Sequence, residues 1–225
     1  MAIKLTTTRQ AAADGGIKAL VYGGAGSGKT TLCATTGGNP LIISAEGGLM
    51  SLREHDLDVL EVSSIEDVME AYKFINDSAE GKEYDWVCLD SLTEIAEVTL
   101  ASLKAKTQDP RQAYGETAET MLRLIKAFRD LPRNIFMTAK MTRDKDELSG
   151  AMLYGPMMPG RQLGPQLPYL FDLVFAYRTE TDGEGQMVRT LQTFKDLQYD
   201  AKDRSGALAP FENPNLSAIA AKIIN

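Results

Sequence analysis

The chain has 225 residues, 44% hydrophobic and 24% charged, which is enough to bury one sizeable α/β core. It contains no run of about 20 apolar residues, and Met1 to Gly16 lacks the apolar centre of a signal peptide, so we expect neither a membrane span nor secretion. Two cysteines, Cys33 and Cys88, are too few for a disulfide framework or a zinc site and favour a reducing, cytoplasmic setting.

The net charge of −7, taken as an average, argues against a nucleic-acid partner. The charge is unevenly spread, because Lys104 to Lys145 carries ten Lys or Arg against five Asp or Glu. That stretch has a local balance of +5, which leaves −12 for the rest of the chain. These basic residues lie either on the solvated face of a helix or on one basic side of the molecule, and both interpretations stay open.

The first half of the chain alternates short apolar runs with helical patterns. Residues 1–16 have the composition of a flexible N-terminal arm, and residues 17–225 form the one predicted domain. The predicted strands are Lys18–Tyr22, Leu41–Ser44, Leu57–Val62 and Trp86–Asp90. A short helix follows the first strand and ends at Gly37-Gly38, and a second helix starts at Ser63, with Glu66 placed for a capping box.

The second half continues the alternation and ends in antiparallel strands. We predict helices over 92–106 and 115–131, separated by the breaker Asp109-Pro110, and a last helix over about 215–224. Further strands are predicted at Ile135–Ala139, Leu173–Arg178 and Met187–Phe194, the last two forming a hairpin. The fold class is therefore α/β, a mostly parallel sheet flanked by helices with a C-terminal antiparallel hairpin. Ligands are expected at the carboxyl ends of its parallel strands.

The segment from Gly23 to Thr30 matches the phosphate-binding pattern G-x-x-x-x-G-K-[ST] in full, between a predicted strand and a helix. Small residues let backbone N–H groups converge on phosphate oxygens, Lys29 reaches the β- and γ-phosphates, and the Thr30 hydroxyl binds Mg²⁺. The predicted ligands are ATP and Mg²⁺. The predicted nucleotide-binding residues are Gly23, Gly24, Ala25, Gly26, Ser27, Gly28, Lys29, Thr30 and Thr31.

Two acidic residues follow buried strands near this loop. Asp90 ends the run Trp86–Asp90, and we expect it to hold Mg²⁺ through a water. It is followed by Ser91 rather than by an acid, so a water-activating glutamate directly after it is absent. Glu46 follows the strand after the phosphate loop, and we predict that it is the catalytic base.

These pieces resemble the RecA-like recombinase core. The matching elements are the phosphate loop, Glu46-Gly47, Leu89-Asp90-Ser91 and Thr138-Ala139-Lys140. The resemblance implies that Lys140 occupies the position of a γ-phosphate sensor, where the family usually has glutamine. It also implies that Lys202 and Arg204 reach the ATP of a neighbouring subunit, so that the site is completed in a homo-oligomer, either a ring or a helical filament.

The chain is most similar to the short, phage-type RecA-core proteins that act as single-strand annealing recombinases. That resemblance implies binding to single-stranded DNA, work alongside a single-strand-binding protein and, if the protein is phage-encoded, a place in the host cell cytoplasm. It also implies DNA contacts from two loops, which correspond to about 107–115 and 142–165. The residues expected to contact DNA are Arg111, Tyr114, Arg143, Lys145, Tyr154 and Arg161.

Two other functions fit the same motifs. A RecA-fold helicase-like motor or loader would unwind DNA directionally or load a partner. A small-molecule phosphotransferase would need an acceptor pocket and a mobile lid, which the segment 142–165 could imitate. A GTPase is disfavoured, because the base-reading motif Asn-Lys-x-Asp is absent from the sequence.

Overall fold

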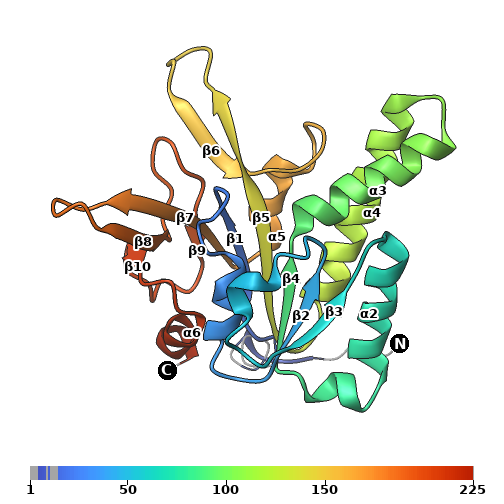
Figure 1. Ribbon diagram of the computed structural model, residues 1–225, viewed down its shortest axis with the longest axis horizontal. Coiled ribbons are helices and arrows are strands. Elements are labelled where there is room, and N and C mark those ends of the chain that lie inside the picture. Colours follow the sequence, from blue (N-terminus) through green and yellow to red (C-terminus); the bar gives the residue numbers. More distant parts are fainter. Residues whose placement is uncertain (1–4, 9, 11–14, 225) are drawn as a thin grey trace.

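The structure is a computed structural model that describes residues 5–8, 10 and 15–224. Within these residues, ten strands form one twisted sheet with helices on both faces (Figure 1). The predicted arm at 1–16 lies largely outside the described residues. The main strand order is β10-β8-β7-β1-β5-β4-β2-β3.

The five inner pairings of this order, between β7 and β3, are parallel. The edge pairings β7–β8 and β8–β10 are antiparallel, and so are those of β6 with β5 and β9 with β7. The strands are β1 (Lys18–Gly23), β2 (Pro40–Ser44), β3 (Asp58–Glu61), β4 (Trp86–Asp90), β5 (Asn134–Lys145), β6 (Met152–Pro156), β7 (Leu173–Thr181), β8 (Met187–Gln192), β9 (Lys202–Asp203) and β10 (Phe211–Glu212). This confirms the predicted mostly parallel α/β fold with a C-terminal antiparallel hairpin.

The helices divide between the two faces because strand side chains alternate in direction. Leu20 and Tyr22 of β1 pack in one apolar cluster with α2, α3 and α4, whereas Ala19 and Val21 pack in the other with η1 and α6. The helices are η1 (Thr30–Thr35), η2 (Leu49–Leu52), α2 (Ile65–Asp77), η3 (Glu80–Glu83), α3 (Leu92–Lys106), α4 (Pro110–Arg129), η4 (Gly164–Gln166), α5 (Leu167–Leu170) and α6 (Leu216–Ile224).

Two predicted helix starts were wrong. The capping box of α2 is formed by Ser64 and Asp67, one residue later than predicted. Helix α4 begins at Pro110 rather than at residue 115, because Asp109 caps it and proline is well tolerated in a first helical turn. The predicted first DNA loop, 107–115, is therefore mostly the start of a helix.

The predicted second loop, 142–165, also contains regular secondary structure. Strand β5 continues to Lys145 and pairs with β6, so that Arg143 lies opposite Tyr154 and Lys145 opposite Met152. The two strands form a hairpin that projects beyond the carboxyl edge of the main sheet (Figure 1). Among the described residues, no helix has the length and apolar character needed to cross a bilayer.

Candidate active site

The phosphate loop joins the end of β1 to the start of η1 and depends on glycine at two positions. Gly26 and Gly28 have positive φ values of 71° and 103°, which L-residues with a side chain rarely adopt. A Cβ atom on Gly28 would also lie 3.1 Å from the hydroxyl of Tyr177. The loop therefore keeps its shape only with glycine at these positions.

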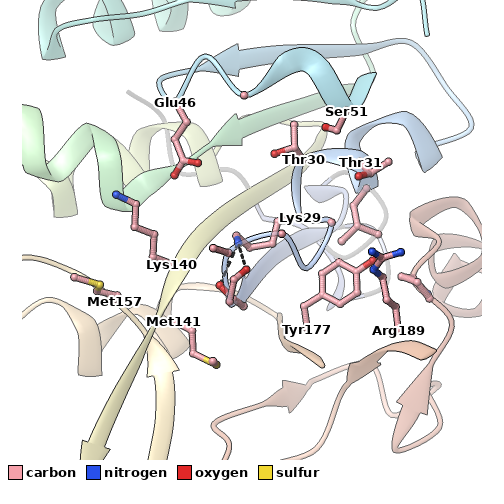
Figure 2. A pocket seen from close by; sticks show the side chains of 18 of the residues that line it. Lys29, Thr30, Thr31, Glu46, Ser51, Lys140, Met141, Met157, Tyr177 and Arg189 are labelled. Atoms are coloured by element: carbon pink, nitrogen blue, oxygen red, sulfur yellow. Dashed lines mark hydrogen bonds between the residues drawn. The ribbon is translucent and has the colours of Figure 1, made fainter. Parts of the chain in front are cut away.

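A cavity of about 1010 Å³ opens over this loop (Figure 2). Eight of the nine predicted nucleotide-binding residues line it, and the exception is Ser27. The Ser27 hydroxyl is buried and has no hydrogen-bond partner among the described residues. Glu46 and Lys140 also line the cavity, so the structure brings the phosphate loop together with two further predicted catalytic residues.

The Lys29 side chain folds over the phosphate loop and contacts its backbone. Its Nζ donates to the carbonyl oxygens of Gly23, at 3.1 Å, and Gly24, at 2.9 Å. Burial lowers the pKa of Lys29, while the nearby carboxylates of Asp90 and Glu46 oppose that shift. A partly desolvated ammonium facing an open cavity is a site for an anion such as a phosphate.

Asp90 lies at the end of β4, and only 2% of its surface is exposed. It accepts a hydrogen bond from the Thr30 hydroxyl at 2.5 Å and another from the Thr138 hydroxyl. Mg²⁺ is usually held by one or two carboxylates together with substrate phosphates, and the described residues contain no larger cluster of acidic, histidine and cysteine ligands. The donor set of Thr30 and Asp90 fits Mg²⁺, which when bound would neutralise charge on the phosphate oxygens.

Glu46 lies in the turn after β2 and faces the cavity (Figure 2). Its Oε1 accepts a hydrogen bond from the Ser91 hydroxyl at 2.5 Å, which fixes the carboxylate beside the end of β4. This contact was not predicted. A carboxylate oriented in this way, next to the phosphate-binding groups, can position and deprotonate a water molecule.

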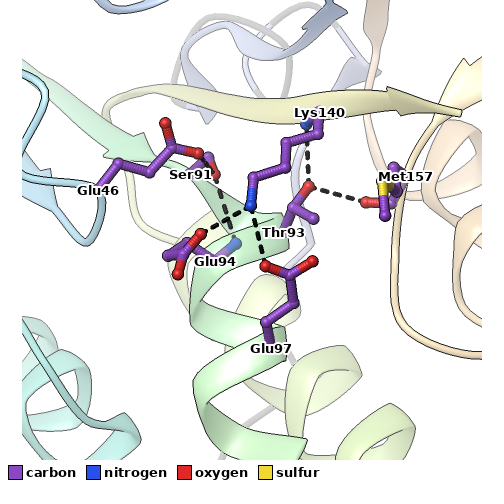
Figure 3. Close-up of polar contacts among 7 residues, drawn as sticks. All are labelled: Glu46, Ser91, Thr93, Glu94, Glu97, Lys140 and Met157. Atoms are coloured by element: carbon purple, nitrogen blue, oxygen red, sulfur yellow. Dashed lines mark hydrogen bonds and ion pairs between the residues drawn. The ribbon is translucent and has the colours of Figure 1, made fainter. Parts of the chain in front are cut away.

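Lys140 lines the cavity but is ion-paired to α3 (Figure 3). Its Nζ lies 2.7 Å from Glu94 Oε2 and 2.9 Å from Glu97 Oε2, and these contacts raise its pKa well above the usual range. The backbone N–H of Lys140 donates to the Thr93 hydroxyl, and this hydroxyl donates to the backbone carbonyl of Met157. Lys140 thus joins the cavity to α3 and to the segment that follows β6.

The predicted DNA-contacting residues lie in three places. Arg111 and Tyr114 are on the first turns of α4, and Arg143 and Lys145 are on β5. Arg161 is exposed in the bend after β6. A Cβ atom on Gly160 would lie 3.2 Å from Tyr114, so the start of α4 and this bend are neighbours.

One face of the Tyr154 ring is covered by packing within the chain. It stacks on Tyr199 with ring centroids 4.5 Å apart and an interplanar angle of 14°. The guanidinium of Arg178 covers Tyr199 in turn, at 4.5 Å from its centroid. Tyr154 therefore supports the base of the hairpin, and base stacking on its covered face is excluded by this packing.

Lys202 and Arg204 lie near the amino ends of the parallel strands, because Lys202 pairs with Val174 near the start of β7. The Lys202 ammonium donates to the Pro168 carbonyl, and burial lowers its pKa. Arg204 pairs with Asp172 at 2.9 Å. Neither residue lines the cavity of its own chain, so any role at an ATP site requires a second subunit.

Sequence reasoning missed four residues around the site. Ser91 donates to Glu46 and Thr138 donates to Asp90, and the available signals were the position of Ser91 next to Asp90 and that of Thr138 two residues before Lys140. Tyr177 and Arg189 line the cavity from β7 and β8. No local motif marks them, since only strand pairing brings them beside the phosphate loop.

Three comparisons with known proteins bear on the family of this chain. A sequence comparison with curated proteins found no match. Among solved structures, the chain is similar to the KaiC-like protein PH0186 from the hyperthermophilic archaeon Pyrococcus horikoshii OT3, with 14% identity, a TM-score of 0.46 and coverage of 77% of this chain and 76% of that one. Residues 15–205 match the family described as AAA domain. Since this match spans most of the chain and includes the phosphate loop, the protein belongs to the AAA domain family and is a P-loop ATPase core.

Proposed function

We propose that this protein hydrolyses ATP to control its binding to single-stranded DNA, and that it promotes strand pairing or annealing during recombination. In this proposal Lys29 binds phosphate, Thr30 and Asp90 hold Mg²⁺, and Glu46 activates the attacking water. Lys202 and Arg204 complete the site of a neighbouring subunit in a ring or filament. A single-strand-binding protein is the expected partner on the DNA.

One observation carries this proposal, namely that a single strand spans from the ATP cavity to the projecting hairpin. Lys140 and Arg143 of β5 both line the cavity, and Lys145 ends the same strand within the hairpin. We propose that a change at the cavity edge is transmitted along this strand to the segment that bears these basic side chains. This coupling is what a nucleotide-controlled DNA-binding protein needs.

The hairpin carries acids as well as bases, which limits how it can bind DNA. Asp144 lies between Arg143 and Lys145, and Asp146 and Glu147 follow them. Side chains alternate along a strand, so Arg143 and Lys145 share one face and Asp144 points to the other. We expect the phosphate backbone to contact the face with the two basic residues, aided by Arg111 and Arg161.

The test is the ATPase rate with and without single-stranded DNA at low salt, for the wild type and the double variant Arg143→Ala with Lys145→Ala. We expect DNA to raise the wild-type rate, and we expect the double variant to need more DNA because it loses two phosphate contacts. The matched control is the double variant Lys73→Ala with Lys82→Ala, which changes one lysine of α2 and one that follows it. It should respond to DNA as the wild type does.

Three results would overturn the proposal. The first is that DNA changes neither the ATPase rate nor the oligomeric state. The second is that the control variant loses as much stimulation by DNA as the hairpin variant does. Phosphate could also be found on an acceptor molecule rather than released into water, which would assign a phosphotransferase. A strand-displacement assay in parallel would identify a directional motor.

A further inference from the structure

We propose that Arg189 binds the nucleoside half of ATP by placing its guanidinium on the face of the adenine base. The inference rests on the ATP site of the proposed function and deepens it, because it names the residue that distinguishes a nucleotide from a bare polyphosphate.

The strand order gives the cavity two ends on either side of the phosphate loop. Glu46 follows β2, which lies three strands from β1, whereas Arg189 is on β8, two strands from β1 in the opposite direction. With neighbouring strands about 4.8 Å apart, these positions are roughly 14 Å and 10 Å from the phosphate loop strand. Figure 2 shows Glu46 and Lys140 on one side of Lys29, and Tyr177 and Arg189 on the other.

The groups that suit the terminal phosphates lie at the first of these ends. The Thr30 hydroxyl bonds to Asp90 at the end of β4, and Glu46 bonds to the adjoining Ser91. If the γ-phosphate lies at that end, a triphosphate chain running over the phosphate loop places its nucleoside toward β7 and β8. That end of the cavity is lined by Tyr177, Arg189, Met187 and Pro214.

The pairing of β7 with β8 places the side chains concerned on one face. Tyr177 lies opposite Leu191, Thr179 opposite Arg189, and Thr181 opposite Met187. Because side chains alternate along each strand, Tyr177, Arg189 and Met187 share a face. All three line the cavity, whereas the intervening Val188 does not, which confirms the direction of this face.

The Arg189 side chain is exposed beside the cavity and makes no ion pair or hydrogen bond with another described side chain, although its charge lies close enough to Tyr177 to oppose the rise in the pKa of that hydroxyl. By contrast, Arg178 lies on the opposite face of the same hairpin, donates a hydrogen bond to Gln192 and forms an ion pair with Glu180. A guanidinium is planar, weakly hydrated and suited to stacking on an aromatic ring. Arg189 is thus available for a ligand, and its geometry suits a purine.

Tyr177 gives this end of the cavity a fixed floor. Only 7% of its surface is exposed, and its hydroxyl lies 3.1 Å from the position of a Cβ atom on Gly28. The ring is therefore packed closely beside the phosphate loop. Arg189 in turn lies where it can cover a base that rests beside this ring, and Met187 and Pro214 add apolar surface around it.

The experiment measures equilibrium binding of ADP and of inorganic tripolyphosphate to the wild type, Arg189→Ala and Arg189→Lys. We expect Arg189→Ala to raise the Kd for ADP about 3- to 30-fold, the range of a cation–π contact, and to leave the Kd for tripolyphosphate unchanged. Arg189→Lys should bind ADP at least about threefold more weakly than wild type, because it keeps the charge but lacks the planar group. In turnover, KM for ATP should rise while kcat stays the same.

Two controls separate this contact from general effects. Val188→Ala changes the neighbouring residue on the opposite face of β8, and Arg123→Ala removes an exposed arginine from α4, so both should bind ADP as the wild type does. The inference is overturned if ADP binding is unchanged in Arg189→Ala, if tripolyphosphate binding falls equally, or if Arg189→Lys recovers wild-type affinity. Failure of DNA to affect turnover would overturn the proposed function alone, because these binding measurements need neither DNA nor hydrolysis.

Discussion

Glu46 Oε1 and the Ser91 hydroxyl are joined by a hydrogen bond of 2.5 Å that links the turn after β2 to the residue after β4. Asp90, immediately before Ser91, accepts a hydrogen bond from Thr30 of the phosphate loop. The predicted base and the predicted metal ligand are therefore held in one continuous set of contacts.

Glu46→Gln should retain ATP binding and lose hydrolysis. The amide keeps the size of the side chain but cannot accept the proton of the attacking water, so we expect kcat to fall by about 10²- to 10⁴-fold. Phosphate release reports hydrolysis, and equilibrium binding of ATP reports the retained affinity. Glu70→Gln, on the exposed face of α2, is the matched control, and unchanged turnover in Glu46→Gln would contradict the assigned role.

Ser91→Ala should lower kcat by about 10- to 150-fold, because removing a hydrogen bond to a carboxylate costs about 1.5–3 kcal/mol and here frees Glu46 to rotate. Ser91→Thr keeps the hydroxyl and should recover most of the rate. In the double variant with Glu46→Gln the Ser91 change should have no further effect, since its role depends on the carboxylate. Additive losses in a double-mutant cycle would show that Ser91 acts by another route.

Asp90→Asn should abolish the Mg²⁺ dependence of nucleotide binding. An amide is a poor magnesium ligand, although its oxygen can still accept a hydrogen bond from Thr30 or Thr138, so the fold should persist. We expect kcat to fall by at least about 100-fold and the difference in ATP affinity with and without Mg²⁺ to disappear. A variant that still binds ATP more tightly with Mg²⁺ than with a chelator would place the metal elsewhere.

The sequence allowed some elements to be predicted to the residue and others not at all. Trp86–Asp90 and residues 92–106 were predicted with the bounds that the structure shows, because a short apolar run and a capped helical pattern are local signals. The hairpin of β5 and β6 was missed, since its charged residues do not alternate with apolar ones and no tight two-residue turn joins Lys145 to Met152. Pro110 was taken as a breaker, although it starts a helix.

The same distinction applies to the cavity. The phosphate loop is one continuous motif, and Glu46 and Asp90 each follow a recognisable buried strand, so their meeting at the sheet's carboxyl edge could be predicted. Arg189 has no such signal, because only the pairing of β8 with β7 and of β7 with β1 brings it to this edge. The ion pairs of Lys140 with α3 could not be predicted either, because only the tertiary fold brings β5 and α3 together.

Lys18 makes the free energy of unfolding depend on pH in the alkaline range. Only 7% of its surface is exposed, and its Nζ donates to the carbonyls of Leu131, at 2.7 Å, and Arg133, at 2.6 Å. Burial lowers its pKa from 10.5 to about 8, so between these values the unfolded chain binds more protons than the folded one. Stability from this group therefore rises as pH increases from about 8 to about 10.5.

Lys18→Met should remove this contribution, which is at most about 3 kcal/mol across that window. The variant should be less stable overall, because two buried carbonyls lose their donor, so the slope against pH is the informative quantity. Urea unfolding at several pH values measures it. If the wild type and Lys18→Met show parallel stability curves between pH 8 and 10.5, Lys18 keeps its proton in the folded state.

Lys140 should govern how strongly turnover depends on DNA. Its ammonium is compensated by Glu94 and Glu97, whose contacts raise its pKa, so it remains charged throughout the neutral range and is held against α3. Replacing both acids with glutamine frees the charge for the cavity. We expect the rate without DNA to rise, by no more than about tenfold because these side chains are partly exposed and screened.

Lys140→Met provides the complementary measurement. It removes the charge and the ion pairs but keeps the backbone link through Thr93 to Met157, so the hairpin and the segment after β6 should stay in place. We expect stimulation by DNA to be lost while the basal rate changes little. If Lys140→Met responds to DNA as wild type does, and the double glutamine variant has an unchanged basal rate, the ion pairs have only a structural role.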